Sequence, residues 1–252
     1  MAAVDHLMSV VPDLESAAIA LTALGFTVTP RSEHSGLGTA NRLVVFPPRY
    51  WELVAVQMPL PVNAPLRRDG LVGLALASAD AEHDREHAAF GSDTAIDFTR
   101  SVMIDGLDQD ARFRIARLHA PAELETYVFL CEHQTPELVW REEWMKHANG
   151  ASALSGMTIS YGKSGNAALR ALLSLPATMP RHATEQFRLA DDPENHSSEA
   201  ARLTGIEVGV PSLRRLREML AAREIAGIEA VDRLRVSLSS IPGTTISFRE
   251  DA

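Results

Sequence analysis

Short apolar runs separated by turn residues dominate the chain, and helical spacing of apolar residues lies between some of them. Residues 4–10 form the first run, and Asp13 follows it in a position suited to cap a helix. Apolar residues then recur at helical spacing as far as Gly25, where a helix end is expected. Three further strands are predicted at 26–30, 42–46 and 50–56. The first unit therefore has the order strand, helix and three strands.

The same order recurs along the chain, in pattern and not in identity. A second unit is predicted from strands at 71–78, 96–103, 111–119 and 126–133, with a short polar helix over 80–90. Further predicted elements are a strand at 155–161, helix 166–175, strand 205–210, helix 212–223 capped by Ser212, and strands at 233–238 and 244–248. A unit of this size cannot bury its own sheet face, so two units are expected to pair around a cleft. We predict an α+β fold with two domains. The N-terminal domain at 1–135 contains two modules, and the C-terminal domain at 150–252 contains shorter, degenerate modules. Residues 175–200 are expected to form a polar excursion without an assigned role.

The composition restricts the classes of partner. The chain has 252 residues, 46% hydrophobic and 23% charged, so it can bury a core without disulfides. A net charge of -9 disfavours nucleic acid and anionic membranes as partners. A single cysteine, Cys131, cannot form an internal disulfide and is typical of a reducing compartment. Without a signal-like N-terminus or a long apolar stretch, the sequence predicts a soluble cytoplasmic protein.

Two polar residues stand in strands that otherwise indicate a core. Strand alternation places His6 on one face with Met8, and Glu52 on one face with Val54. A glutamate buried among valines is costly unless it is paired or bound to a cation. An imidazole and a carboxylate on one sheet face form half of a divalent-metal site. The pair could equally hydrogen-bond to each other alone or lie near a solvent-exposed rim, and the spacing does not decide between these arrangements.

The residues between His6 and Glu52, together with a later segment, resemble those of a known family. The segments VDHLMSVVPDLESAAIALTALGFTV, HSGLGTANRLVVF, YWELVAV and KHANGASAL, in this order, resemble the glyoxalase-like domains of the vicinal oxygen chelate superfamily. The resemblance implies tandem βαβββ modules whose curved mixed sheets enclose a cleft for a metal or a ligand. It also implies that the first and last strands of a module supply the metal ligands, and His6 and Glu52 occupy those two places.

The later units depart from the family pattern. Alignment of their first strands places Leu74 and Met157 opposite His6, and Glu250 lies only at the end of the closing strand. The replacement ligands are His133 at a strand end and His147 before the third unit. A set of His6, Glu52 and one of these histidines suits iron, manganese, nickel or zinc. Alternatively, His133 is a surface residue and the ring of His147 bonds to the backbone of its turn.

Other side chains are candidates for contact with a substrate. We expect Met8, Asn41 and Trp51 to contact it, and Arg42 either to bind an anionic group or to form a structural ion pair. Packing is the alternative role of Trp51. Cys131 fits best as a small core residue.

These features predict a metal-dependent enzyme that acts on a small oxygenated substrate. The ion would bind two neighbouring oxygens and stabilise an enolate or oxyanion, which suits lyase, isomerase, ring-opening and dioxygenase reactions. Glu52 would be a ligand or a general base whose pKa is raised by burial. The alternatives are a metal-free binding protein of the resistance type and a metal-free acid–base catalyst that uses His6 and Glu52. A homodimer is also expected from exposed sheet edges.

Overall fold

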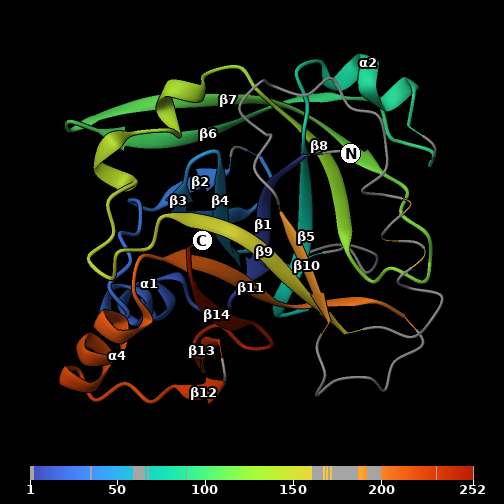
Figure 1. Cartoon of the computed structure of the whole chain (residues 1–252). Coiled ribbons are helices and arrows are strands. Elements are labelled where there is room, and N and C mark those ends of the chain that lie inside the picture. Colours follow the sequence, from blue (N-terminus) through green and yellow to red (C-terminus); the bar gives the residue numbers. More distant parts are fainter. Residues whose placement is uncertain are drawn as a thin grey trace.

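The computed structural model of the chain describes residues 3–34, 36–58, 66, 68–88, 90–160, 167, 169, 171, 187–191, 200–230 and 232–251. The predicted order of strand, helix and three strands occurs twice in its first half (Figure 1). The first module contains β1 (Val4–Val10), α1 (Leu14–Ala23), β2 (Ser32–His34), β3 (Thr39–Phe46) and β4 (Arg49–Val56). The second contains β5 (Gly70–Ala77), α2 (Ala81–Glu86), β6 (Ile96–Ile104), β7 (Leu107–Leu118) and β8 (Tyr127–His133).

These eight strands close into one barrel in the order β1-β4-β3-β2-β6-β7-β8-β5. Within each module the first and last strands run parallel, and all other neighbours run antiparallel. The modules join at two seams, β1 with β5 and β2 with β6. The second seam is narrow, because its register consists of one pair, His34 with Arg100. The interior of the barrel is therefore shared by both modules.

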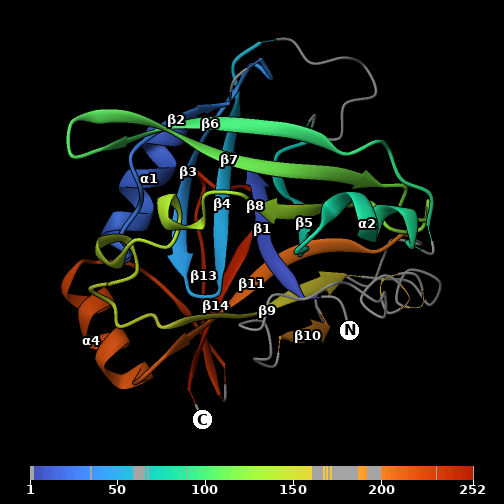
Figure 2. The same ribbon diagram turned by 90° about the horizontal axis from the view of Figure 1, so that it is seen from above.

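The second half of the chain forms a separate sheet beneath the barrel (Figures 1 and 2). Its elements are β9 (Ala153–Ser160), β10 (Arg188–Asp191), β11 (Arg202–Val210), α4 (Leu213–Ala222), β12 (Ile228–Ala230), β13 (Arg233–Ser237) and β14 (Thr245–Glu250), in the strand order β10-β9-β11-β14-β13-β12. Two short 3-10 helices, η2 (Pro136–Leu138) and η3 (Glu142–Trp144), lie in the connection from the barrel. One hydrophobic core contains residues of both halves, such as Trp51 of the barrel and Phe248 of the sheet. The domain boundaries at 1–135 and 150–252 stay a prediction.

Local chemistry explains the ends of the first helix. The Asp13 side chain accepts a hydrogen bond from the Ser16 N–H at 2.7 Å, as expected for an N-cap. At the other end Gly25 has a φ of 86°, and the N–H of Phe26 donates to the Leu21 carbonyl at 3.0 Å. A side chain at Gly25 would also meet Asn149 at 2.9 Å. The glycine is therefore required by both the turn and the close approach.

One predicted strand is displaced. Residues 26–30, expected as a strand, are irregular, and β2 begins at Ser32. Their backbone groups are used elsewhere, because the Thr27 N–H donates to Nδ1 of His147 and the Thr29 N–H to the Leu43 carbonyl. Most of the helix predicted at 166–175 and of the excursion at 175–200 lies outside the described residues.

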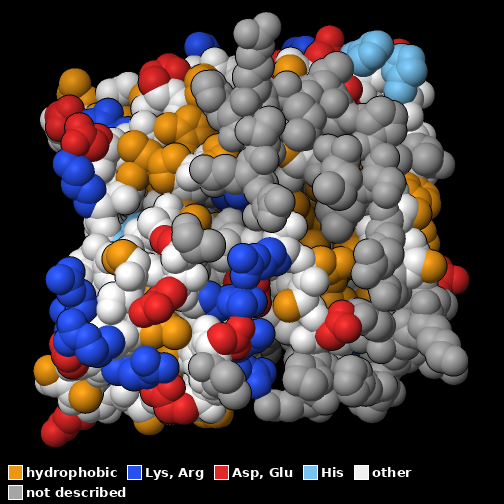
Figure 3. Space-filling model, in the orientation of Figure 1, with side chains coloured by type: hydrophobic (Ala, Val, Ile, Leu, Met, Phe, Trp, Pro, Cys, Tyr) orange, Lys and Arg blue, Asp and Glu red, His pale blue; other side chains and the backbone are white. Residues whose placement is uncertain are grey.

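Charged and hydrophobic side chains gather on different parts of the face drawn in Figure 3. Acidic and basic side chains intermingle over the lower half of the view in Figure 3, and hydrophobic ones gather at its upper left, over the β6 and β7 end. Within the described residues, no helix combines the length and the apolar character needed to cross a membrane.

The connection to the second sheet is fixed to the barrel by His147. Its Nδ1 accepts from the Thr27 N–H and its Nε2 donates to the Val45 carbonyl, each at 3.0 Å. The ring also lies 4.9 Å from the ring of Phe46 and 5.7 Å from that of Phe26. Burial lowers the pKa of His147, and its bond to Val45 partly opposes that effect. Both ring nitrogens are therefore occupied by backbone groups.

We expect His147→Ala to lower the free energy of unfolding by about 2–4 kcal/mol, because it leaves two backbone groups unpaired and opens a cavity. Urea denaturation measures the change. His83→Ala, at an exposed position of helix α2, is the control and should change stability by less than about 0.5 kcal/mol. Equal, small effects of both substitutions would contradict the anchoring role.

Candidate functional site

The interior of the barrel contains a cavity of about 240 Å³. Its wall is mostly apolar and aromatic, as in many small-molecule sites. Polar groups enter it from five strands, β1, β2, β3, β4 and β6: His6, His34, Thr39, Asn41, Glu52 and Arg100. All but Arg100 belong to the first module. The polar side chains of the cavity are therefore concentrated on one side of the barrel.

Glu52 is the centre of this polar group. It projects from the middle of β4 and is 7% exposed. Its Oε1 accepts from Nδ2 of Asn41 at 2.5 Å and lies 3.5 Å from Nε2 of His34. Its Oε2 lies 3.6 Å from Nε2 of His6. The carboxylate is thus placed between two imidazoles, one beside each oxygen.

Both imidazoles are oriented by a partner on the other ring nitrogen. Nδ1 of His6 lies 2.6 Å from Oδ1 of Asp5, and Nδ1 of His34 lies 2.8 Å from Oγ1 of Thr39. In a neutral ring whose Nδ1 donates in these bonds, Nε2 carries the lone pair, which is the form that binds a metal ion; in the charged ring, Nε2 carries a proton and faces Glu52 as a donor. Within the described part of the chain, Nε2 of His34 has no hydrogen-bond partner. This arrangement is typical of histidines that bind metal ions.

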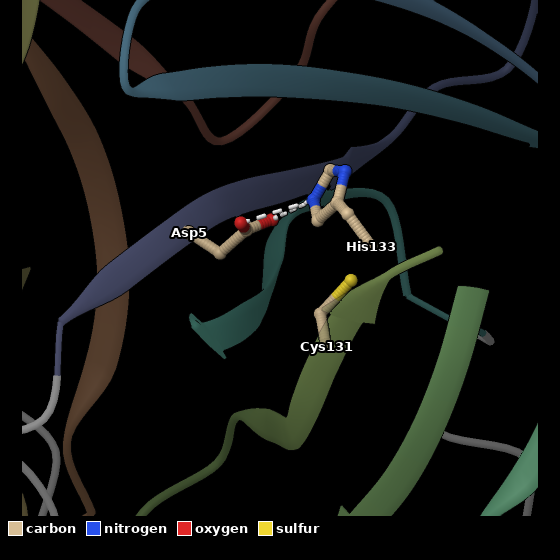
Figure 4. A group of neighbouring side chains, drawn as sticks. All are labelled: Asp5, Cys131 and His133. Atoms are coloured by element: carbon tan, nitrogen blue, oxygen red, sulfur yellow. Dashed lines mark hydrogen bonds and ion pairs between the residues drawn. The ribbon is translucent and has the colours of Figure 1, made fainter. Parts of the chain in front are cut away.

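A β-bulge brings Asp5 to His6. The register of β1 against β5 shifts between Val4 and His6, so the side chains of Asp5 and His6 do not point to opposite faces of the sheet as they would in a regular strand. Its carboxylate also lies 3.1 Å from Nε2 of His133 (Figure 4). Burial alone would raise the pKa of Asp5, but the two histidines hold it well below its usual value. Asp5 therefore stays ionised and connects His133 to His6.

Two sets of side chains could hold a metal ion. Among the described residues, Asp5, Cys131 and His133 bring ligand-capable atoms within 4.8 Å of one another. In that set, burial and the charge of Asp5 raise the pKa of the Cys131 thiol well above its usual value, and thiols bind metals as thiolates. The second set is His6, His34 and Glu52. Its ligand atoms are not grouped as closely, and an ion there would require the imidazoles to turn toward it.

The structure brings together four of the residues singled out from the sequence. His6, Met8, Asn41 and Glu52 all line the cavity. His133 lies behind His6, bonded to Asp5.

Three others lie elsewhere. Arg42 is directed away from the cavity, where it donates to the carboxylate of Glu15 and the carbonyl of Thr29 at 2.8 Å. Trp51 packs in the core that the barrel shares with the second sheet, and donates to Ser9 at 2.9 Å. His147 is bonded to backbone groups, as described above. Strand alternation explains the first two, because Arg42 and Trp51 neighbour the inward-facing Asn41 and Glu52.

Three residues of the site were not singled out from the sequence. His34 lies in the short strand β2, between the strands predicted at 26–30 and 42–46, and its pairing with Thr39 is seen only in the structure. The position of the Asp5 side chain in the site depends on a β-bulge that the sequence does not indicate. Arg100 stands in a predicted strand, where alternation alone does not decide which face is inside.

The pKa of Glu52 differs from the expectation. Burial by itself would raise it, as predicted, but contact with His34, the charge of His6 and the bond from Asn41 outweigh burial and lower it from 4.5 to about 2. Glu52 is thus a weak base and a carboxylate that stays ionised at neutral pH.

This shift predicts a dependence of stability on pH. Because the folded pKa is below the unfolded one, the contribution of Glu52 is complete above about pH 4.5 and is lost as pH falls toward about 2. Wild-type protein should lose roughly 2 kcal/mol more than Glu52→Gln over this interval. Denaturation at several pH values in the presence of chelator measures the difference. Parallel curves for the two proteins would contradict the pKa assignment.

Comparison with known proteins identifies the family. The profile described as "Glyoxalase-like domain" matches residues 4–175. No curated protein sequence matches the chain significantly.

Solved structures share the fold across the whole chain at low identity. A hypothetical protein from Staphylococcus aureus has a TM-score of 0.65 at 10% identity, covering 98% of this chain and 99% of its own. A mutant of 4-hydroxymandelate synthase from Streptomyces coelicolor has a TM-score of 0.63 at 10% identity, covering 99% and 93%. A xylose isomerase-like TIM barrel/4-hydroxyphenylpyruvate dioxygenase fusion protein has a TM-score of 0.56 at 10% identity, covering 99% of this chain and 50% of its own. The paired modules, their closed barrel and the matching profile show that this chain belongs to the glyoxalase-like domain family of the vicinal oxygen chelate superfamily.

Proposed function

We propose that the chain is a metal-dependent enzyme that acts on a small oxygenated substrate inside the barrel. The observation that carries the proposal is the placement of Glu52 between Nε2 of His6 and Nε2 of His34, at 3.6 and 3.5 Å. These separations exceed those of good hydrogen bonds. Once the two imidazoles turn toward a common point, they suit donor atoms that share an ion, because ligands bound at about 2.0–2.2 Å lie roughly 3 Å or more apart.

The donor set fits a divalent transition metal. Two imidazoles and one carboxylate are the ligands of non-haem iron(II) oxygenases, and they also suit manganese, nickel and zinc. Asp5 and Thr39 hold the Nδ1 atoms, which is the outer-shell support that such ligands need. Nε2 of His34, which has no hydrogen-bond partner within the part of the chain that the structure describes, is a buried polar atom that an ion would satisfy.

Each side chain then has a defined task. When bound, an ion would act as a Lewis acid on two neighbouring oxygens of the substrate. Glu52 serves as a ligand and not as the general base, because its pKa of about 2 makes it a weak base. Asn41 orients the carboxylate through its 2.5 Å bond, and the apolar wall around Met8 excludes water.

Among the four reaction types considered, dioxygenase chemistry fits this donor set best. The structural similarity to a 4-hydroxyphenylpyruvate dioxygenase fusion protein supports this choice at the level of the fold. A homodimer and a cytoplasmic location stay predictions.

Metal analysis tests the proposal. Protein loaded with Fe²⁺, Mn²⁺ or Zn²⁺ and freed of excess metal should retain about one ion per chain by inductively coupled plasma mass spectrometry. His6→Ala combined with Glu52→Ala should abolish this retention, because it removes two donors, and should lower thermal stability only modestly. His34→Ala alone should weaken binding.

Cys131→Ser is the matched control, since Cys131 also lines the cavity but belongs to the other set. It should leave the metal content unchanged. Loss of metal in Cys131→Ser, with retention in the His6 and Glu52 double variant, would move the site to Asp5, Cys131 and His133. Absence of metal from the wild-type protein would reject the enzyme proposal in favour of a metal-free binding protein.

A further inference from the structure

Arg100 is a buried cation at the wall of the cavity. It projects from β6 into the cavity and is 3% exposed. Its Nη1 donates to Oγ of Ser32 at 3.1 Å, and its guanidinium carbon lies 5.8 Å from the centre of the Phe113 ring. Its Nη2 is buried and, among the described residues, has no hydrogen-bond partner.

Among the described residues, the charge of Arg100 also has no counter-ion within ion-pair distance. Glu52 lines the same cavity, but its oxygens face His6, His34 and Asn41. Within the described ranges of the chain, no carboxylate forms an ion pair with the Arg100 guanidinium. A buried charge without a close partner is destabilising, and burial lowers the pKa of Arg100, although the charge of Glu52 across the cavity opposes that effect. A guanidinium stays charged at neutral pH, so an anion is the partner that it lacks.

We propose that the cavity recognises small carboxylic acids with an apolar body, and that the Arg100 guanidinium binds the carboxylate after a small turn of the side chain that opens Nη2 to the cavity. This assignment rests on the proposed function for the site and names its substrate class. Guanidinium matches carboxylate in shape and charge, and the bonds formed are the strong, charge-assisted kind. Arg100 is then a specificity residue that the sequence did not single out.

The rest of the cavity fits the same class of ligand. Phe98, Phe113, Tyr127 and Phe129 supply an aromatic wall for an apolar body. Because Arg100 is paired with His34 across the seam, the carboxylate would lie at the His34 end of the cavity. A phosphate dianion is disfavoured, because Glu52 and Asp5 already place negative charge nearby.

The test compares a carboxylic acid with a neutral amide of the same shape. Isothermal titration calorimetry would measure 3-phenylpropanoate, 3-phenylpropanamide and phenylethyl phosphate at pH 7, on purified protein with and without chelator treatment. Wild type should bind the acid at least about tenfold more tightly than either other ligand. Arg100→Gln should bind acid and amide equally. Arg112→Gln, an exposed arginine on β7, is the control and should keep the preference.

Equal binding of acid and amide to wild type overturns the inference, and this comparison does not depend on whether the variant folds. A preference that requires the metal and survives in Arg100→Gln also overturns it, because the carboxylate would then bind the ion. A tighter complex with the phosphate rejects the carboxylate class.

Failure of this inference can be told apart from failure of the proposed function. Bound metal without a preference for the acid rejects only the role of Arg100. Preference for the acid without bound metal rejects the metal-dependent enzyme and leaves a carboxylate-binding cavity.

Discussion

A carboxylate held inside an apolar barrel is the constraint on which this structure depends. Removal of Glu52 from water is unfavourable, and only close partners keep it ionised there. The partners are two imidazoles and an amide, each oriented by further bonds to Asp5 or by position in the β2–β3 hairpin. The result is an ordered polar centre in a cavity that is otherwise hydrophobic, and the proposed metal site follows from it.

The two modules contribute different kinds of side chain to the cavity that the closed barrel encloses. The first module supplies the imidazoles and the carboxylate. In the second module, the parallel strands β5 and β8 place Ala75 opposite Phe129, and both side chains pack in the interior core. The second module contributes apolar surface and one cation, Arg100, which the narrow β2–β6 seam brings beside His34. The proposed ion site and the proposed anion site thus lie next to each other.

The sequence predicted the elements well where local signals were strong. The strand Val4–Val10 and the caps at Asp13 and Ser212 were predicted correctly from apolar runs and capping residues. The resemblance to glyoxalase-like domains and the α+β fold were confirmed. Side-chain direction was harder, because the faces of β3 and β4 are set by closure of the barrel; Arg42 and Trp51 therefore lie outside the cavity. The lowered pKa of Glu52 could not be predicted, because it depends on His34 and Asn41, which only the fold brings together.

Anomalous diffraction from crystals grown with Mn²⁺ or Co²⁺ tests the central claim most directly. The account predicts an anomalous peak inside the barrel, at coordination distance from Nε2 of His6, a carboxylate oxygen of Glu52 and Nε2 of His34. A peak between Asp5, Cys131 and His133, or no peak in a cavity with Glu52 in the same place, would contradict it.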